Sequence, residues 1–199
     1  MRVRRIHILA AVVFVAVCCT PAGGPARRDW PQPAGWTGPG QVPPPQRMKL
    51  WFGGDVMQHM PQVEAARCGE RFDYRPVFAA LAPRMRAADL TVVNLETTLT
   101  RRGRYTGYPL FRSPVALADA LRDAGVDVAV LANNHCCDGG AEGIRTTVAE
   151  LDRCGILHTG VFADSADYKK NNPLYLNRCG MRLAIVNYTY GTNGMPVPA

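Results

Sequence analysis

Residues 126–135 read VDVAVLANNH, an almost entirely apolar run that ends in two amides and a histidine. The run 126–132 is short and rich in valine, which is typical of a strand buried on both faces of a sheet. Asn133, Asn134 and His135 follow at its carboxyl end. A buried parallel strand with polar side chains directly after it predicts an α/β protein with a binding site at that edge of the sheet.

Two earlier stretches repeat this arrangement. Residues 48–52 predict a strand that ends at a glycine pair and leaves Asp55 at its carboxyl end. Residues 90–93 predict another strand, which runs into Asn94 and Glu96. Since the carboxyl ends of parallel strands converge on one edge of a sheet, we expect the three polar clusters to meet there.

The rest of the domain alternates helical and strand-like patterns. The order β-α-β-α-β-α-β followed by a β-hairpin predicts parallel strands and then antiparallel ones. Apolar periodicity, proline and glycine positions predict helices at 76–87, shortened or kinked by Pro83, at 114–124, capped by Ser113, and at 139–153. They also predict a strand at 156–161 and a hairpin from 174–176 and 181–188.

The N-terminal 47 residues do not join this pattern. Three arginines precede an unbroken apolar run of ten residues, 8–17, which predicts a signal peptide over 1–19. We therefore expect an exported protein of the cell envelope, periplasmic or at the outer surface, that contacts a membrane only through its leader or a lipid anchor. Lipid attachment at Cys18 or Cys19 and simple secretion are alternatives. The proline- and glycine-rich segment 20–47 predicts a linker, so the domain occupies 48–199.

Charge and cysteine content limit the function classes. The net charge of +7 falls to +4 without the leader arginines, a mild excess that is compatible with an anionic substrate. No block of basic residues interleaved with aromatics indicates a nucleic-acid partner. The seven cysteines follow no metal-ribbon spacing, so we expect no disulfide framework and a place in the core for most of them.

The residue types at the strand ends suit a divalent cation. Asp55 and Glu96 would supply charge, Asn134 a neutral oxygen, and His135 a ligand or a proton donor. A bound metal can polarise a phosphoryl or carbonyl oxygen, which indicates hydrolysis. Taken singly, each residue has an ordinary alternative as a turn, surface or loop residue.

Three further residues are additional candidates for this site. Asn94 and His59 lie close to the proposed ligands in the sequence, and Asp138 follows His135 by three residues. Asp138 is more simply explained as the N-cap of the next helix. His158 lies in a predicted strand without an acidic neighbour in the sequence, which favours a core or edge position. No phosphate-binding glycine loop or serine-hydrolase motif is present.

Three motifs in register resemble a known family. They are Gly54-Asp55-Val56-Met57, Asn94-Leu95-Glu96, and Ala132-Asn133-Asn134-His135 with Asp138. Their kind, order and spacing resemble the CapA (poly-γ-glutamate capsule biosynthesis) family of the calcineurin-like metallophosphoesterase superfamily, over residues 48–195. The resemblance implies a sandwich of two β-sheets flanked by helices, with Asp55, Glu96 and Asn134 as ligands of Mn, Fe or Zn and His135 as the general acid.

The resemblance is incomplete in two respects. Met57 and Glu96 replace a histidine and an aspartate of the wider superfamily, and its later histidine motifs do not occur before Ala199. We therefore expect an N-terminal fragment whose C-terminal part is missing. The resemblance leaves two hypotheses: a metal-dependent hydrolase of a phosphoester or of an amide in an anionic polymer, or a non-catalytic surface accessory protein that binds or exports such a polymer. Components of capsule synthesis or export are the expected partners.

Overall fold

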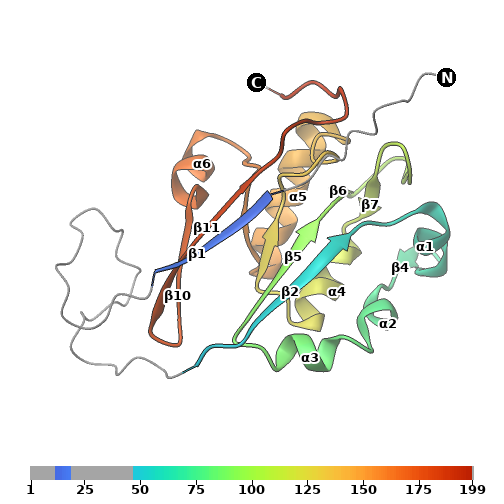
Figure 1. The fold of residues 1–199 in the computed structure, drawn as a ribbon. Coiled ribbons are helices and arrows are strands. Elements are labelled where there is room, and N and C mark those ends of the chain that lie inside the picture. The colour runs from blue at the N-terminus through green and yellow to red at the C-terminus, as the bar shows by residue number, and fades with distance from the viewer. Residues whose placement is uncertain (1–11, 19–46, 199) are drawn as a thin grey trace, which may run out of the picture.

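A four-stranded parallel sheet forms the centre of the fold in the computed structural model, which describes residues 12–18 and 47–198. The strands lie in the order β2-β5-β8-β9, so each new strand is added to the same edge (Figure 1). All of the predicted linker 20–47 except residue 47 lies outside the described residues, as does the predicted signal peptide except for 12–18, which form a strand, β1, paired with β11 (Met181–Tyr188). The strands of this sheet are β2 (Leu50–Val56), β5 (Leu90–Leu95), β8 (Val128–Val130) and β9 (Leu157–Thr159).

A second, antiparallel sheet covers one face of the first. Its strands are β10 (Leu174–Arg178), β11 (Met181–Tyr188) and β1 (Val12–Cys18), in the order β1-β11-β10. The predicted hairpin is confirmed. Apolar residues from the facing sides of both sheets form one core: Leu90, Val92, Val128, Val130, Leu174, Leu176, Leu183 and Ile185. This is the α/β sandwich of two sheets that the resemblance implies, and the predicted fold class is confirmed.

Helices cover the other face of the parallel sheet (Figure 1). The two longest in that layer are α4 (Ala116–Ala124) and α5 (Gly140–Cys154), and each ends at a glycine with positive φ, Gly125 at 97° and Gly155 at 71°. Their own side chains Leu117, Leu121 and Leu151 are fully buried, and burial of such a side chain contributes about 1.5–3 kcal/mol. Both glycine stops were correctly predicted.

The predicted helix 76–87 is two short helices, α2 (Arg75–Phe78) and α3 (Ala82–Arg86). Pro83 lies in the first turn of α3, where its missing N–H costs nothing, so the helix restarts there. Phe78 and Met85 are buried as expected, but Val77 and Leu81 are 53% and 44% exposed. The apolar periodicity that predicted one helix here therefore does not correspond to one buried face.

The predicted helix cap at Ser113 is also wrong. Ser113 lies in β7 (Arg112–Pro114), which pairs with β6 (Thr98–Thr100), and its hydroxyl contacts that of Thr97 at 2.9 Å. Pairing with β6 delays the start of α4 to Ala116. The remaining elements are α1 (Met60–Ala65), β3 (Arg67–Cys68), β4 (Arg71–Phe72) and α6 (Ser165–Asn171). Among the described helices, none has the length and apolar character needed to cross a membrane.

The glycine pair after Phe52 lies inside β2 rather than at its end. The strand continues to Val56, and its register against β5 shifts between Phe52 and Asp55. A β-bulge of this kind redirects the side chains that follow it. A Cβ at Gly53 would lie 2.6 Å from the Trp51 ring, so the close approach requires glycine. The irregularity sets Asp55 opposite Asn94.

The described cysteines follow the sequence prediction only in part. Cys68, Cys136, Cys137, Cys154 and Cys179 are all free. Cys137 and Cys154 are buried, as expected for core residues, but Cys68 and Cys179 are exposed. The expectation of a core position is therefore wrong for Cys68 and Cys179.

Candidate metal centre

Asn94 joins the two candidate carboxylates across the ends of β2 and β5. Its Nδ2 donates to Asp55 Oδ1 at 2.8 Å and to Glu96 Oε2 at 2.9 Å. Asp55 is exposed, whereas Asn94 and Glu96 are buried. The two strand ends therefore meet as predicted, with the additional candidate Asn94 between the two carboxylates.

No lysine or arginine in the described part of the chain forms an ion pair with Asp55 or Glu96, although His135 acts to lower the pKa of Glu96. Burial raises the pKa of Glu96 above its usual value, and the nearby Asp55 carboxylate raises it further. A bound cation would oppose both effects. Two adjacent carboxylates at the open end of a parallel sheet fit a divalent cation.

Asn133 connects these carboxylates to the third strand end. The side chain is fully buried, and its Nδ2 donates to Asn94 Oδ1 at 3.1 Å and to the Leu95 carbonyl at 3.0 Å. Its Oδ1 accepts from the His135 backbone N–H at 3.0 Å. Asn133 thereby fixes the loop after β8 against β5. The sequence signal, two adjacent asparagines, did not distinguish this positioning role from a simple turn.

His135 is held by Asp138 in the turn that follows. Its Nδ1 lies 2.8 Å from Asp138 Oδ2, which also accepts from the Phe111 backbone N–H at 2.6 Å. An ionised carboxylate only accepts, so this contact assigns the proton of a neutral imidazole to Nδ1 and leaves Nε2 free for other chemistry. Both side chains are buried.

Asp138 is therefore not the helix cap that we predicted. The N-cap of α5 is Gly139, and Asp138 forms no cap hydrogen bond. Its second oxygen, Oδ1, is buried and has no hydrogen-bond partner among the described residues. The carboxylate instead contacts His135 Nδ1 and accepts from the Phe111 backbone N–H just before β7. The turn 135–138 directs it into the protein rather than toward the helix.

Phe111 contacts two histidines. Its ring meets His135 edge to face at 4.6 Å and His59 at 5.0 Å between centroids. His59 is exposed at the start of α1, whereas His135 is buried. Asn193, from the loop after β11, has its Nδ2 3.4 Å from His135 Nε2. Asn193 was not predicted as a site residue, because it lies 58 positions from His135 in the chain.

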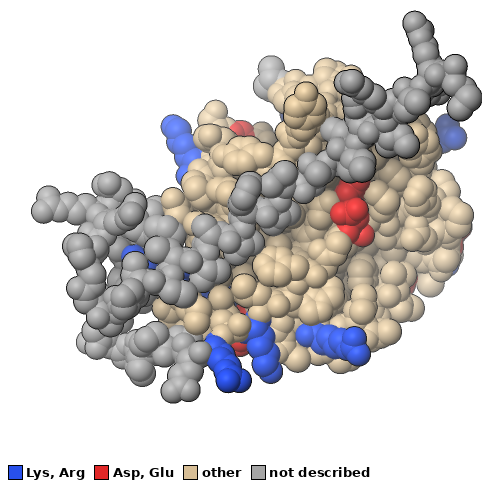
Figure 2. Space-filling view, viewed as in Figure 1, with Lys and Arg blue, Asp and Glu red and all other residues tan. Residues whose placement is uncertain are grey.

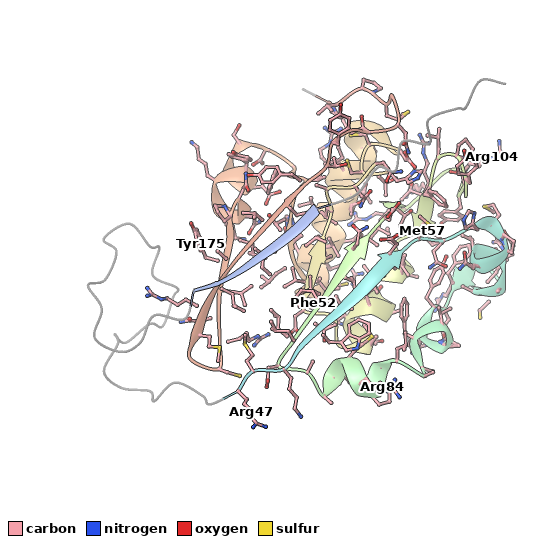
Figure 3. The ribbon with its side chains drawn as sticks, in the orientation of Figure 1. Arg47, Phe52, Met57, Arg84, Arg104 and Tyr175 are labelled. Carbon is pink, nitrogen blue, oxygen red and sulfur yellow. The ribbon has the colours of Figure 1, made fainter. Side chains whose placement is uncertain are left out.

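Asn134 and Met57 complete the surroundings. Asn134 is half-buried, and its side chain forms no hydrogen bond with other described residues, which leaves its amide oxygen available to a ligand. Met57 lies directly beyond the end of β2 (Figure 3). An acidic patch is visible on this face near the end of β2, and basic side chains are visible along the lower edge and at the upper left and right (Figure 2). The local charge therefore favours a cation at the site.

His158 lies in β9, away from the hydrogen-bonded residues of the site. It is buried, as expected of a core residue, and folding brings to it two carboxylates that are not neighbours of it in the sequence. Its Nε2 is 3.5 Å from Asp152 Oδ1 and 3.7 Å from Asp167 Oδ1, contributed by α5 and α6. The sequence could not show this, because the two helices approach the strand only after folding.

The second sheet contacts the site through Asn187 of β11. Its Oδ1 accepts from the Ala132 backbone N–H at 2.5 Å, and its Nδ2 donates to the Ala132 carbonyl at 3.3 Å. Ala132 immediately precedes Asn133. Gly160 lies against this pair, and a Cβ there would come within 2.1 Å of Asn187 Oδ1. The loop that carries His135 is thus supported from both sheets.

Comparison with known proteins identifies the same region of the chain. The family described as bacterial capsule synthesis protein PGA_cap matches residues 49–198. The capsule biosynthesis protein CapA of Bacillus anthracis is 24% identical over 152 residues, which cover 72% of this chain and 35% of that protein.

Shorter matches have higher identity. A probable polyglutamine synthesis accessory protein of Mycobacterium tuberculosis is 39% identical over 83 residues, 39% of this chain and 21% of that protein. An uncharacterized protein of Sinorhizobium fredii is 35% identical over 95 residues, 44% of this chain and 21% of that protein. The aligned regions thus span between a fifth and about a third of these relatives.

Proposed function

Because this chain belongs to the CapA family of bacterial capsule synthesis proteins, we propose that it acts in the biosynthesis of a capsule polymer such as poly-γ-glutamate, as a metal-dependent hydrolase. The bond cleaved is a phosphoester or an amide of an anionic polymer. The proposal concerns the whole protein in its cell-envelope setting, where capsule synthesis or export components are its partners.

One observation carries the proposal: the Asp55 and Glu96 carboxylates converge on a single amide, Asn94, without a lysine or arginine partner in the described residues. Asp55, Glu96 and Asn134 would hold a divalent cation, with manganese, iron and zinc as the candidates. When bound, the cation supplies electrophilic activation of a phosphoryl or carbonyl oxygen.

The chain's own residues supply the proton transfer. Asp138 accepts from His135 Nδ1 and so fixes the imidazole plane. Nε2 faces the loop that carries Asn193. As an imidazolium, which carries hydrogens on both nitrogens, His135 can give its Nε2 proton to a leaving oxygen or nitrogen and return to the neutral form protonated at Nδ1. Phe111 packs against the imidazole edge to face and limits its motion. His135 therefore acts as the general acid, and Asp138 positions it.

The test is turnover by the full-length protein, stripped of metal and then supplied with Mn²⁺, on a chromogenic phosphodiester and on γ-linked glutamate oligomers. Asp55→Asn and His135→Ala should each abolish the metal-dependent rate. Glu142→Gln, a change at a side chain that is 81% exposed on α5, should leave it unchanged. Equal rates in the wild type and in both site variants would refute the hydrolase.

A second candidate function is non-catalytic polymer binding at the cell surface. The Mycobacterium relative is named a probable accessory protein of polyglutamine synthesis, and Met57 and Glu96 depart from the superfamily motifs. Polymer retention on the immobilised protein that survives chelator and both site substitutions, together with absent turnover, would favour this function. Retention that is lost with Asp55→Asn would argue for the hydrolase.

Export through the predicted signal peptide is part of the same proposal. Deletion of residues 1–19, which also removes β1 from the second sheet, should move the protein from the envelope fraction to the cytoplasm, and thermal unfolding of the variant checks that it still folds. Cys18→Ser and Cys19→Ser, made separately and together, test lipid attachment by the loss of a radiolabelled acyl group. Unchanged fractionation after the deletion would count against export by this leader.

A further inference from the structure

Two thiols lie side by side in the turn that carries His135. Cys136 Sγ and Cys137 Sγ are 3.8 Å apart, and both cysteines are free. The turn is held by hydrogen bonds from the Cys136 N–H to the Asn133 carbonyl and from the Gly140 N–H to the Cys137 carbonyl. The sequence alone favoured a core-filling role, but Cys136 is only half-buried.

Both cysteines line a cavity of about 640 Å³ between the start of α5, the segment after β9 and the segment after β11. Ala141, Ile144 and Val161 form apolar parts of its wall. A cavity of this size admits a small ion and a further small ligand. The pair of sulfurs is therefore reachable from solvent even though Cys137 is buried.

We propose that Cys136 and Cys137 form a chelating dithiol site for one soft, thiophilic d¹⁰ cation, with Cu⁺ as its occupant. The two sulfurs bind the same ion from the cavity side. The proposal does not depend on the hydrolase or on the carboxylate site, since neither Asp55 nor Glu96 contributes a ligand.

The sulfur separation suits a shared ion. At metal–sulfur bonds of about 2.3 Å, sulfurs 3.8 Å apart enclose a sulfur–metal–sulfur angle of about 110°. A linear arrangement would require a separation of about 4.6 Å. The bent geometry leaves a coordination position toward the cavity, where a chloride or a free thiol from solution can bind.

A disulfide between the same sulfurs is disfavoured. It requires a sulfur–sulfur distance of about 2.04 Å and a Cα separation of about 4.4–6.8 Å, whereas adjacent residues across a trans peptide have their Cα atoms only about 3.8 Å apart. A metal ion, by contrast, displaces the thiol protons directly.

The ligand set selects the ion. Thiolates prefer soft cations such as Cu⁺, whereas structural Zn²⁺ usually takes four protein ligands. No group of three or more His, Cys, Asp or Glu side chains is placed to hold a metal within residues 47–198. Two thiols and one Cu⁺ give a bis-thiolate cuprous complex and two released protons, with no change of oxidation state.

The test is an anaerobic titration of the full chain with Cu⁺ against a chromophoric Cu⁺ chelator. The background carries serine at Cys18, Cys19, Cys68 and Cys179, because Cys18 and Cys19 are a second adjacent pair and the other two thiols are exposed. One equivalent of Cu⁺ should bind, with thiolate-to-copper absorption in the near ultraviolet. Cys136→Ser and Cys137→Ser should each weaken binding at least 100-fold.

Four controls distinguish this site from another thiol, from the carboxylate site, from a zinc site and from loss of folding. Cys154→Ser, which removes a buried single thiol, and Asp55→Asn should both leave Cu⁺ binding unchanged, so that failure of the carboxylate site is not mistaken for failure of this one. Zn²⁺ should bind at least 100-fold more weakly than Cu⁺. Both serine variants should unfold at the same temperature as the background protein, which would show that they are folded. Failure to withdraw copper from the chelator, or equal binding by either serine variant, overturns the proposal.

Discussion

Asn187 of β11 holds both backbone groups of Ala132, accepting from its N–H at 2.5 Å and donating to its carbonyl at 3.3 Å. The side chain thus acts as a strand partner for the last residue before Asn133. Asn187 is 1% exposed, so no solvent replaces these bonds. These two hydrogen bonds therefore join the antiparallel sheet to the loop of the candidate metal centre.

We expect Asn187→Ala to lower the free energy of unfolding by about 3 kcal/mol, because two buried backbone groups lose their partner. Urea unfolding followed by tryptophan fluorescence measures the change. Asn177→Ala on β10 is the control, since its Oδ1 accepts no hydrogen bond among the described residues, and it should cost less than about 1 kcal/mol. Equal losses for the two variants would contradict the role of Asn187.

We expect Gly160→Ala to be more destabilising than Gly155→Ala. Both glycines have positive φ, 98° and 71°, so each substitution carries a backbone cost of about 1 kcal/mol. Only at Gly160 does the added Cβ also meet Asn187 Oδ1 at 2.1 Å and the Ala132 nitrogen at 2.7 Å, whereas nothing lies within 4 Å at Gly155. The difference in unfolding free energy should be about 1–3 kcal/mol. A smaller loss at Gly160 than at Gly155 would rule out this close packing.

We expect Glu96→Gln to stabilise the metal-free protein at pH 7 and to weaken its response to metal. The pKa of Glu96 in the fold lies above its ordinary value of 4.5, so the native state binds this proton more tightly than the unfolded state. Stability therefore falls as the pH rises through 4.5 and beyond, and the amide removes that loss. Thermal unfolding should show an increase of about 3 °C without metal.

The same variant should lose most of the stabilisation that Mn²⁺ gives the wild type. Binding to the native state alone raises stability, and loss of one charged ligand lowers affinity. Glu142→Gln, at an exposed side chain, is the control. It should change neither the unfolding temperature without metal nor the stabilisation by Mn²⁺. A metal response of wild-type size in Glu96→Gln would exclude Glu96 as a ligand.

We expect Asp138→Asn to reduce the proposed turnover by about 10²–10⁴-fold, mainly in kcat, because the amide no longer fixes the proton on His135 Nδ1. Steady-state kinetics with Mn²⁺ measure the effect. Metal affinity should be retained, which separates positioning of His135 from loss of the metal site. Asp123→Asn at the exposed end of α4 is the matched control. Full activity in Asp138→Asn would show that His135 needs no partner.

Local pattern was sufficient for the four strands of the parallel sheet, for the hairpin and for the helices α4 and α5. Glycine at the ends of α4 and α5 and the apolar runs of β5 and β8 determine those elements within a few residues, because capping and burial act over one or two turns. The pattern failed where distant pairing competes with local preference. Ser113 has the chemistry of a cap, but pairing between β6 and β7 takes it into a strand.

The sequence by itself determined which side chains stand at the strand ends, since parallel topology brings Asp55, Asn94 and the residues after β8 to one edge. Only the tertiary structure decided how they are used. Asp138 turns inward to His135, and Asn187 and Asn193 arrive from a strand and a loop more than 50 positions away. The physical reason is that propensity and periodicity are properties of neighbouring residues, whereas a hydrogen bond between distant segments exists only once both sheets have packed.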